Sequence, residues 1–323
     1  MLPKLFIERL KKIIPSEKLA SVLHSFEQTK KPTFRVNTLK IHIAEIRSLL
    51  QQENIQAYAV NGFDNAFTVD VAQRDALTHS GLHSQGKIYI QNLSSMLAPL
   101  ILNPQPGEEV LDLTAAPGSK TSQMAMLMQN QGRIAAVEKS KTRFFKLKDS
   151  LEKQGVTCAK LYHRDGATVW RHCRHRFDRV LLDVPCSSET RFSLRDPESY
   201  QYWSEKKIKS CARMQWLLLY SAFQSLKPGG TMVYSTCSFA PEENEFIIAK
   251  LLKKFPNQIT LKKIVFPIEN TQPGLTQWSE KHLPKTLCNT VRILPNEIMN
   301  GFYLTHLQKR VIEIPNLQRC CLF

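Results

Sequence analysis

The stretch from Val110 to Thr121, VLDLTAAPGSKT, decides how the rest of the chain is interpreted. It begins with a mostly apolar run that follows the turn signal PQPG at 104–107. Small residues come next, and a helical pattern, KTSQMAMLMQ, begins at Lys120. A strand, a small-residue turn and an amphipathic helix in this order predict the first unit of a parallel α/β sheet. The small residues let the backbone approach a ligand at the helix N-terminus, where free amides favour negative charge.

Small residues alone do not separate a ligand-binding turn from an ordinary turn between a strand and a helix. Two familiar phosphate-binding motifs do not fit. The chain has no G-x-G-x-x-G sequence, and GSKT at 118–121 lacks the glycine that a P-loop places five residues earlier. The later segments of the chain must therefore show what this turn binds.

The composition is that of a globular protein whose length allows two domains. The chain has 323 residues, of which 42% are hydrophobic and 22% are charged. No apolar run is long enough to cross a membrane. The N-terminal residues MLPKLFIERLKKIIP predict a basic amphipathic helix rather than a secretory signal, and Glu8 and Glu17 argue against a mitochondrial presequence. We expect a cytoplasmic protein without a membrane partner, and a monomer.

Eight cysteines raise the question of disulfide bonds or bound metal. The chain contains no C-x-x-C pair, and an intracellular protein keeps its thiols reduced. His172, Cys173 and His175 are close in sequence, but a second ligand pair is missing, so we expect no metal site.

The charge balance indicates a polyanionic partner. The formal net charge is +16, and residues 139–180 contain 12 Lys and Arg against 4 Asp and Glu, a net charge of +8. Nucleic acid is the usual partner of so basic a protein. A well-solvated surface has the same composition, so charge alone leaves both interpretations open.

Residues 1–85 have the pattern of a small α/β domain. Two short helices are predicted over 7–14 and 19–26, followed by the strand TFRVNTLK, the helix IAEIRSLLQQENI and the strands IQAYAV and AFTVDV. Arg35 and Asn37 alternate with apolar residues, so they share one face of the first strand. They would either face RNA or lie exposed at the sheet surface, and the sequence alone favours the second.

The rest of the chain alternates apolar runs with helical stretches. GKIYIQNLSSML opens it with a strand and a helix, and we place the domain boundary just before this segment, near residue 85. The strands that follow are EVLDL, RIAAVE, CAKLYHRD, DRVLLDVPC and KPGGTMVYSTCS, with VRILP and GFYLTHLQK at an edge. This order predicts a doubly wound α/β sheet over residues 86–311, with its strands ending on one rim. Residues 312–323 are expected to form a loose C-terminal tail.

Acidic residues stand at the ends of these strands, where ligands of open α/β sheets bind. They are Asp112, Glu138, Asp165 and Asp183. A carboxylate at the end of the second strand is the usual partner of ribose hydroxyls, which gives Glu138 a role. Each acid taken alone could also be a solvent-facing residue that starts a loop. Together with the turn at 110–121 they favour a nucleoside-containing cofactor.

Cys186 and Cys237 end two strands that are neighbours in the predicted order. A thiolate is a strong nucleophile, and its pKa, ordinarily about 8.5, falls near positive charge. Each thiol alone could be an inert buried side chain. Two thiols on the catalytic rim of a reduced protein point to chemistry.

These segments resemble one family of enzymes. VLDLTAAPGSKT, LLDVPCSS and VYSTCSFAPEEN are similar to motifs of the Nop/Sun (RsmB-like) family of RNA cytosine-5 methyltransferases, which use S-adenosylmethionine. FRVNTLK, YIQNLSSMLA and VRILPNEIMNGFYLTHLQK extend the resemblance over about residues 34–309, and the paired PC and TC cysteines are its most specific part. The implied fold is a doubly wound, Rossmann-like class I methyltransferase sheet with a smaller N-terminal α/β (RRM-like) domain that binds RNA.

The resemblance also implies roles for individual residues. Cys237 would be the nucleophile, Cys186 would help the product to leave, and Asp183 would contact both the cofactor and the target base. Glu138 would hold the ribose, and Asp165 would lie beside the adenine. The methionine part of the cofactor would be wrapped by the turn residues Thr114, Ala115, Ala116, Pro117, Gly118, Ser119 and Lys120.

Three positions depart from the family pattern. Thr114 stands where Cys is frequent, Ser119 where Gly is usual, and Glu138 where Asp is common. The first two exchange one small residue for another, whereas the third adds a methylene that shifts the ribose contact. None of the three removes a chemical function.

The implied reaction explains why these residue types are needed. Carbon 5 of cytosine is a poor nucleophile, and covalent attack at carbon 6 converts the ring into an enamine. Cys237 as a thiolate would make this attack, while Asp183 would favour the charge that develops on the ring nitrogen and the exocyclic amine. Carbon 5 then loses its proton and Cys237 is expelled, which Cys186 is placed to assist. The target base must leave its stack unless it is already single-stranded.

The loop Arg191–Trp203, RFSLRDPESYQYW, mixes aromatic and Arg side chains that suit unstacked RNA bases, or that pack inward as an ordinary active-site loop. The leading hypothesis is a cytosine-5 methyltransferase that acts on structured RNA, with ribosomal RNA favoured over transfer RNA. The alternative is a non-catalytic RNA-binding ribosome-assembly factor that keeps the fold, and the two cysteines argue against it. DNA or a small-molecule substrate fits the basic charge and the N-terminal domain less well.

Overall fold

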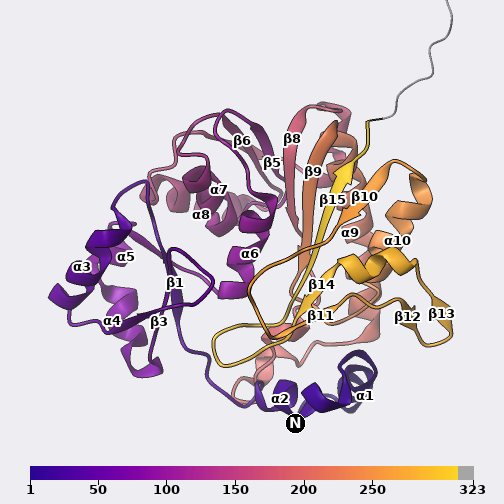
Figure 1. Ribbon diagram of the computed structural model, residues 1–323, viewed down its shortest axis with the longest axis horizontal. Coiled ribbons are helices and arrows are strands. Elements are labelled where there is room, and N and C mark those ends of the chain that lie inside the picture. Colours follow the sequence, from indigo (N-terminus) through magenta and orange to yellow (C-terminus); the bar gives the residue numbers. More distant parts are fainter. Residues whose placement is uncertain (312–323) are drawn as a thin grey trace, which may run out of the picture.

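The computed structural model describes residues 1–311. Figure 1 shows a large twisted sheet with a smaller sheet domain beside it and two N-terminal helices below it. These helices are α1 (Lys4–Ile13) and α2 (Ser16–His24). No helix in the described part of the chain is both long and apolar enough to span a bilayer.

Helices α1 and α2 pack against the large domain rather than against the small sheet. Phe6 of α1 is buried with Phe192 and Phe239, which follow strands of the large sheet. The ring centroids of Phe6 and Phe192 are 5.0 Å apart. The sequence placed this segment in the N-terminal domain, but its apolar side chains are buried next to the predicted catalytic rim.

The small domain is a four-stranded antiparallel sheet in the order β2-β3-β1-β4. Its strands alternate with helices as βαββαβ, the ferredoxin-like arrangement of RRM-like domains. Phe34, Leu50 and Ile88 are part of its core. The elements are β1 (Thr33–Val36), α3 (Ile46–Gln52), β2 (Ala57–Ala59), β3 (Ala66–Val69), α4 (Arg74–His79), α5 (Gly81–Ser84) and β4 (Ile88–Ile90), with short 3₁₀ turns at Ile43–Glu45 and Val71–Gln73.

Strand β4 extends the small sheet beyond the boundary that the sequence suggested near residue 85. β4 pairs with β1, with Ile90 opposite Phe34. The sequence assigned this strand to the second domain because a helix follows it directly. Its partner lies far earlier in the chain, and a three-residue strand carries no local signal of that pairing.

The large sheet has nine strands and confirms the doubly wound fold. Its order is β11-β14-β15-β9-β8-β5-β6-β7, and β10 also pairs with β15. Strands β5 to β9 run parallel to one another, and all other pairings, including that of β9 with β15, are antiparallel. The strands are β5 (Glu109–Asp112), β6 (Arg133–Glu138), β7 (Ala159–His163), β8 (Phe177–Asp183), β9 (Leu226–Thr236), β10 (Ile259–Lys262), β11 (Thr271–Pro273), β14 (Val291–Ile293) and β15 (Phe302–Lys309), and a separate hairpin joins β12 (Gln277–Trp278) to β13 (Lys281–His282).

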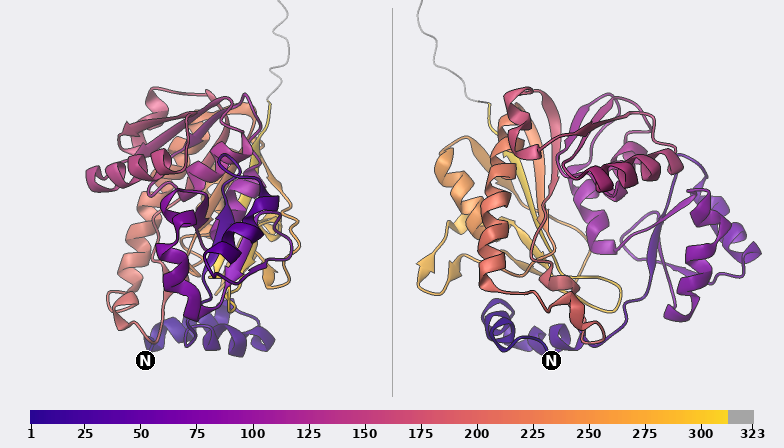
Figure 2. Two further views of the ribbon diagram at one scale, coloured as in Figure 1. Left: turned by 90° about the vertical axis from the view of Figure 1, so that its left-hand side faces the viewer. Right: turned by 180° about the vertical axis from the view of Figure 1, so that it is seen from behind.

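Helices cover both faces of this sheet. On one face, α6 (Leu93–Leu102), α7 (Ser119–Leu127) and α8 (Lys141–Lys153) bury the apolar side chains that β5 and β6 direct towards them. On the other face lie α9 (Glu205–Ser225) and α10 (Glu245–Lys254), and the view from behind in Figure 2 shows α9 running lengthwise in front of the sheet. Short 3₁₀ segments occupy Gly166–Arg171 (η3), Glu189–Arg191 (η4), Pro197–Ser199 (η5) and Lys285–Asn289 (η6).

Arg35 and Asn37 of the small domain are neither RNA-facing nor exposed, so both interpretations from the sequence were wrong. Arg35 is fully buried, and its guanidinium donates to Ser122 Oγ at 2.6 Å and to the Ser119 carbonyl at 3.2 Å in α7. Asn37 donates to the carbonyl of Gln154, which follows α8, at 2.8 Å. These side chains join the two domains because a buried polar group needs a partner, and the second domain supplies it.

Candidate active site

The turn between β5 and α7 is held against two neighbouring strands. The N–H of Leu113 donates to the carbonyl of Leu181 in β8 at 3.2 Å, and that of Ala115 donates to Val137 in β6 at 2.9 Å. Gly118 has a φ of +105°, and a Cβ there would lie 3.1 Å from a leucine of α8. Both the backbone angle and the close approach require glycine. The turn thus brings the amino end of α7 to the rim where the parallel strands end.

Asp183 is fixed by contacts from two sides. Lys120 Nζ in α7 donates to Asp183 Oδ2 at 2.5 Å, and Ser235 Oγ in β9 donates to Oδ1 at 2.8 Å. Thr114 Oγ1 donates to the Asp183 carbonyl at 2.9 Å. The side chain of Asp183 is still 26% exposed, so it can meet a ligand at the rim. Two residues that were predicted to wrap the cofactor, Thr114 and Lys120, therefore also position this carboxylate.

Glu138 and Asp165 lie at the ends of β6 and β7. Glu138 is buried, and its carboxylate accepts from the Ser140 N–H at 2.7 Å and pairs with Arg143 at 3.5 Å. Asp165 accepts a hydrogen bond from Lys139 at 2.7 Å, which holds the pKa of Asp165 below its usual range. A carboxylate has about four lone-pair sites, so both residues can accept further hydrogen bonds from a ligand.

Asp112 differs from the other acids of the predicted rim. It is buried beneath the turn and accepts from Thr121 Oγ1 of α7 at 2.7 Å. Burial raises the pKa of Asp112 to about 6. This residue fastens the helix to the strand rather than facing a ligand.

Cys186 and Cys237 meet at the ends of the neighbouring strands β8 and β9. Their Sγ atoms are 2.9 Å apart, and the Cys237 N–H donates to Cys186 Sγ at 3.3 Å. Both thiols are free and partly accessible. Asp183 of β8 is opposite Ser235 of β9 in the strand register. Cys186 comes three residues after Asp183, and Cys237 comes two residues after Ser235. The predicted adjacency of the two thiols is therefore present in the structure.

The two thiols are not equivalent. The hydrogen bond from Cys186, together with the positive charge of Arg191, lowers the pKa of Cys237 to about 7 although burial opposes this. The same contact and burial raise the pKa of Cys186 well above its ordinary value. At neutral pH the pair therefore favours a thiolate on Cys237 and a thiol on Cys186, the ionisation that suits a nucleophile and a proton donor.

A buried carboxylate links the loops that carry the two thiols. Glu243 is inaccessible to solvent and accepts from the Ser187 N–H at 2.9 Å and from Ser238 Oγ at 2.8 Å. It also accepts from the Ser187 hydroxyl and from Gln215 of α9, the latter at 2.8 Å. Ser187 follows Cys186 and Ser238 follows Cys237. Glu243 thus fixes the backbone on both sides of the thiol pair.

The aromatic side chains of the loop that contains Arg191 differ in how they pack. Phe192 is buried, and Trp203 Nε1 donates to the buried Glu189 at 2.8 Å. The other Glu189 oxygen accepts from Ser238 Oγ at 3.0 Å. Tyr202, in contrast, is 76% exposed. The inward-packing interpretation is therefore correct for Phe192 and Trp203, whereas Tyr202 and most of the polar residues of the loop are exposed.

The predictions from sequence missed Glu189, Glu243 and Arg191 as parts of the site. Glu189 lies within SSET, which directly follows the PC cysteine, and Glu243 lies within PEEN, which begins four residues after the TC cysteine. Acidic residues so close to a reactive thiol were the available signal. Their role was hidden because it depends on contacts between loops that are far apart in the sequence.

Two family models match the chain. Residues 99–308 match the family described as 16S rRNA methyltransferase RsmB/F, and residues 2–93 match the N-terminal domain of 16S rRNA methyltransferase RsmF. The chain belongs to the RsmB/F family. It is therefore an S-adenosylmethionine-dependent RNA cytosine-5 methyltransferase, as the motifs around Cys186 and Cys237 suggested.

Relatives in the RsmB/F family differ in length and in the RNA that they are named for. A tRNA (cytosine(49)-C(5))-methyltransferase of Pyrococcus abyssi is 36% identical over 312 residues, which cover 95% of this chain and 96% of the relative. Ribosomal RNA small subunit methyltransferase F of Vibrio cholerae is 36% identical over 286 residues, covering 87% of this chain. That match spans only 60% of the Vibrio protein.

Solved structures agree with this assignment. A methyltransferase homologue from Pyrococcus horikoshii is 32% identical and superposes with a TM-score of 0.81, over 96% of this chain and 95% of its own. NSun6 from the same organism, at 21% identity and a TM-score of 0.79, shows the fold alone.

The rim suits the S-adenosylmethionine that this family uses. Gly118 keeps the turn free of a side chain where α8 approaches, and Glu138 offers a carboxylate at the end of β6. Asp165 offers a second carboxylate at the end of β7. A nucleoside ligand of a doubly wound sheet needs such groups along this edge.

Proposed function

We propose that this chain methylates carbon 5 of cytosine in structured RNA through a covalent bond between Cys237 and the target base. The observation that supports this most is the pairing of two unequal thiols, 2.9 Å apart, at the ends of β8 and β9. Cys237 has the lowered pKa and Cys186 the raised one. This asymmetry matches a nucleophile beside a proton donor.

The proposed sequence begins with attack of the Cys237 thiolate on carbon 6 of cytosine. The electron pair of the 5,6 double bond then becomes available at carbon 5, and Asp183 holds the ring nitrogen and exocyclic amine where charge changes. S-adenosylmethionine supplies the methyl group as an electrophile. Loss of the carbon 5 proton to water would restore the double bond and expel Cys237 as a thiolate, which the S–H of Cys186 would stabilise by a hydrogen bond.

We assign the cofactor site to the turn and the rim acids. The methionine part would lie along Thr114–Lys120, with Pro117 and Ser119 among its contacts. Glu138 would accept from the ribose hydroxyls, and Asp165 would lie beside the adenine. The contacts described for these residues support the assignment because they fix the carboxylates and leave acceptor capacity.

We infer that ribosomal RNA is the first candidate substrate and transfer RNA the second. Both matching family models carry a 16S rRNA description, which supports the first. The nearly full-length match with the Pyrococcus tRNA enzyme supports the second. We further propose that the protein acts as a monomer in the cytoplasm, which light scattering and cell fractionation would test.

The decisive experiment incubates purified protein with methyl-labelled S-adenosylmethionine and unmodified ribosomal or transfer RNA. Label should appear in 5-methylcytosine in one RNA pool, and Cys237→Ala should abolish it. Cys288→Ala is the matched control because this thiol is exposed and lies in η6, which contributes none of the site residues described above. No transfer by the unaltered protein would favour the alternative, a ribosome-assembly factor that binds RNA without turnover. Full activity of Cys237→Ala would remove the nucleophile assignment.

A further inference from the structure

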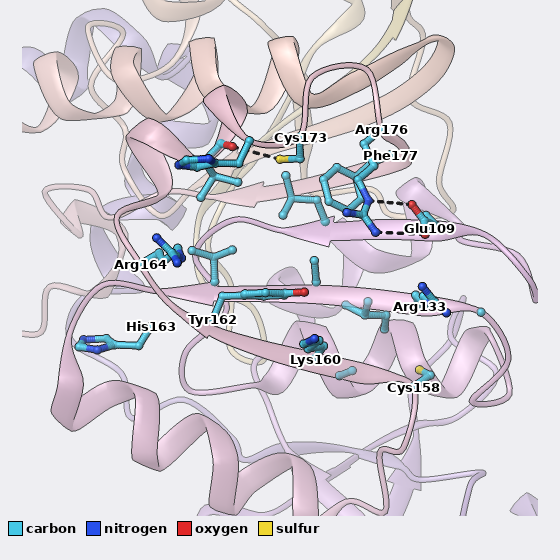
Figure 3. Close-up of a pocket in the computed structure, with 18 of the residues that line it drawn as sticks. Glu109, Arg133, Cys158, Lys160, Tyr162, His163, Arg164, Cys173, Arg176 and Phe177 are labelled. Atoms are coloured by element: carbon cyan, nitrogen blue, oxygen red, sulfur yellow. Dashed lines mark hydrogen bonds and ion pairs between the residues drawn. The ribbon is translucent and has the colours of Figure 1, made fainter.

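A groove of about 1120 Å³ lies over β5, β6 and β7, away from the thiol pair. Leu111, Ala135 and Val137 supply apolar floor, and the η3 segment forms one wall. Figure 3 shows Lys160 and Tyr162 together on β7, with Arg133 and Arg164 towards opposite ends of the view.

The groove exists because this part of the sheet lacks a long helix. Between β7 and β8 the chain forms only η3 (Gly166–Arg171), while α8 covers the opposite face of β6 and β7. β7 is also the edge strand. Parallel sheets are normally covered on both faces, so an open face here is an available binding surface.

The charge of the groove is unbalanced. Its two acids are already paired: Glu109 binds Arg176 at 3.1 Å, and Asp165 binds Lys139 at 2.7 Å. Three further cations line the groove, and none of them has a carboxylate within 4.0 Å among residues 1–311: Arg133, Lys160 and Arg164. An anion is therefore the complementary partner.

The spacing of these cations excludes a single small anion. Arg133 lies at the start of β6, one residue before Ile134, which is opposite Ala159 at the start of β7. Arg164 lies at the other end of the groove, just after the end of β7. At about 3.3 Å per strand residue the two ends of the groove are about 20 Å apart. One phosphate or carboxylate cannot meet both, but a chain of phosphates can.

An aromatic side chain lies between the cations. Tyr162 is half-buried, and Lys160 Nζ is 5.8 Å from the centre of its ring. Proteins that bind single-stranded nucleic acid combine a basic groove with aromatic rings on which bases stack. An acidic protein segment would neutralise the three cations, but its carboxylates would not stack on the Tyr162 ring as a base does.

We propose that this groove binds a single-stranded segment of the RNA substrate outside the target cytosine. The inference rests on the proposed function, since it takes RNA as the substrate. Asp165 lines the groove and also belongs to the rim, so the groove opens beside the cofactor end of the active site. RNA phosphates would lie along Arg133, Lys160 and Arg164, with one base on Tyr162.

The test measures binding of a fluorescent, unstructured RNA of about 12 nucleotides, within the range of known single-strand sites. The triple variant Arg133→Gln, Lys160→Gln, Arg164→Gln should bind this RNA about ten-fold more weakly. The salt slope, which is the steepness of the fall of log affinity with log salt concentration, should be smaller by about 2. Tyr162→Ala should also weaken binding, and Tyr162→Phe should restore it. The control neutralises three exposed lysines on α10 and η6, namely Lys253, Lys254 and Lys285.

Turnover separates this inference from the proposed function. On full-length substrate RNA the groove variants should raise KM with kcat unchanged, because the removed contacts lie away from the reacting atoms. Photo-crosslinking should join RNA to Tyr162 in the unaltered protein. If the triple variant methylates RNA with unchanged RNA affinity, KM and salt slope, the groove assignment is wrong and the proposed function still stands. Absence of methylation by the unaltered protein would instead count against the proposed function, and the binding and crosslinking results would still decide the groove.

Discussion

The sulfur of Cys186 lies 2.9 Å from the sulfur of Cys237 and also accepts the backbone N–H of Cys237 at 3.3 Å. One thiol thus contacts both the side chain and the main chain of its neighbour. The S–H of Cys186 stabilises negative charge on Cys237, so the proton stays on Cys186. The expected reactivity of the site follows from this relationship.

Removal of the Cys186 hydrogen bond should raise the pKa of Cys237. The thiolate is the reactive form, so alkylation by iodoacetamide should rise with pH through about 7 in the unaltered protein. In Cys186→Ala the rise should move to higher pH, and in Cys186→Ser it should move less because a donor remains. Mass spectrometry of the modified Cys237 peptide measures both curves. Superimposable curves for the three proteins would show that Cys186 does not set this pKa.

Cys186→Ala should also trap RNA on the protein. If Cys186 assists the expulsion of Cys237, its loss leaves the methylated base bonded to the enzyme. A slow-migrating RNA–protein band should then appear on a denaturing gel. The double variant Cys186→Ala, Cys237→Ala is the control, since it cannot form the bond. A Cys186→Ala protein that turns over without such a band would contradict the release role.

Glu243→Gln should lower kcat at least ten-fold with little change in cofactor affinity. The carboxylate accepts hydrogen bonds from both thiol loops, and the amide replaces one acceptor by a donor that faces Ser187 or Ser238. The variant should also lose about 2 kcal/mol of stability, because hydrogen bonds to a buried charge are involved. Urea unfolding and steady-state kinetics measure the two effects. Glu280→Gln, at an exposed position, should change neither.

Arg35→Ala should destabilise the whole protein by about 3 kcal/mol, since it leaves buried acceptors in α7 without a donor. Arg35→Lys should recover only part of this, because an ammonium cannot reach several acceptors in the same plane. Urea denaturation followed by tryptophan fluorescence gives the change. Arg47→Ala, on the exposed face of α3, is the comparison, and equal midpoints for the two alanine variants would disprove the link between the domains.

The parallel strands and the thiol pair were predictable because their signals are local. An apolar run that ends in an acid or a cysteine marks the end of a strand, and chain order then brings Cys186 next to Cys237. The turn between β5 and α7 was predictable for the same reason, since Gly118 stands between a strand and a helix.

Contacts between distant segments were not predictable in this way. Arg35 looked exposed because alternation in a strand defines two faces but does not say which face another domain covers. Glu243 was missed because its four donors come from three separate segments of the chain. The open face of β7 was hidden because only the structure shows that the segment before β8 is too short to cover it.

The guanidinium of Arg35 inserted into α7 has a consequence for how this enzyme chooses its cytosine. Because this contact fixes the small sheet to the large domain, the distance between the small sheet and the sulfur of Cys237 is constant. An RNA bound by both the small sheet and the active site would have to present its cytosine at one fixed separation from the point where the small sheet holds it. Loosening the contacts of Arg35 and Asn37 with the large domain would let that separation vary, and methylation would then spread to neighbouring nucleotides.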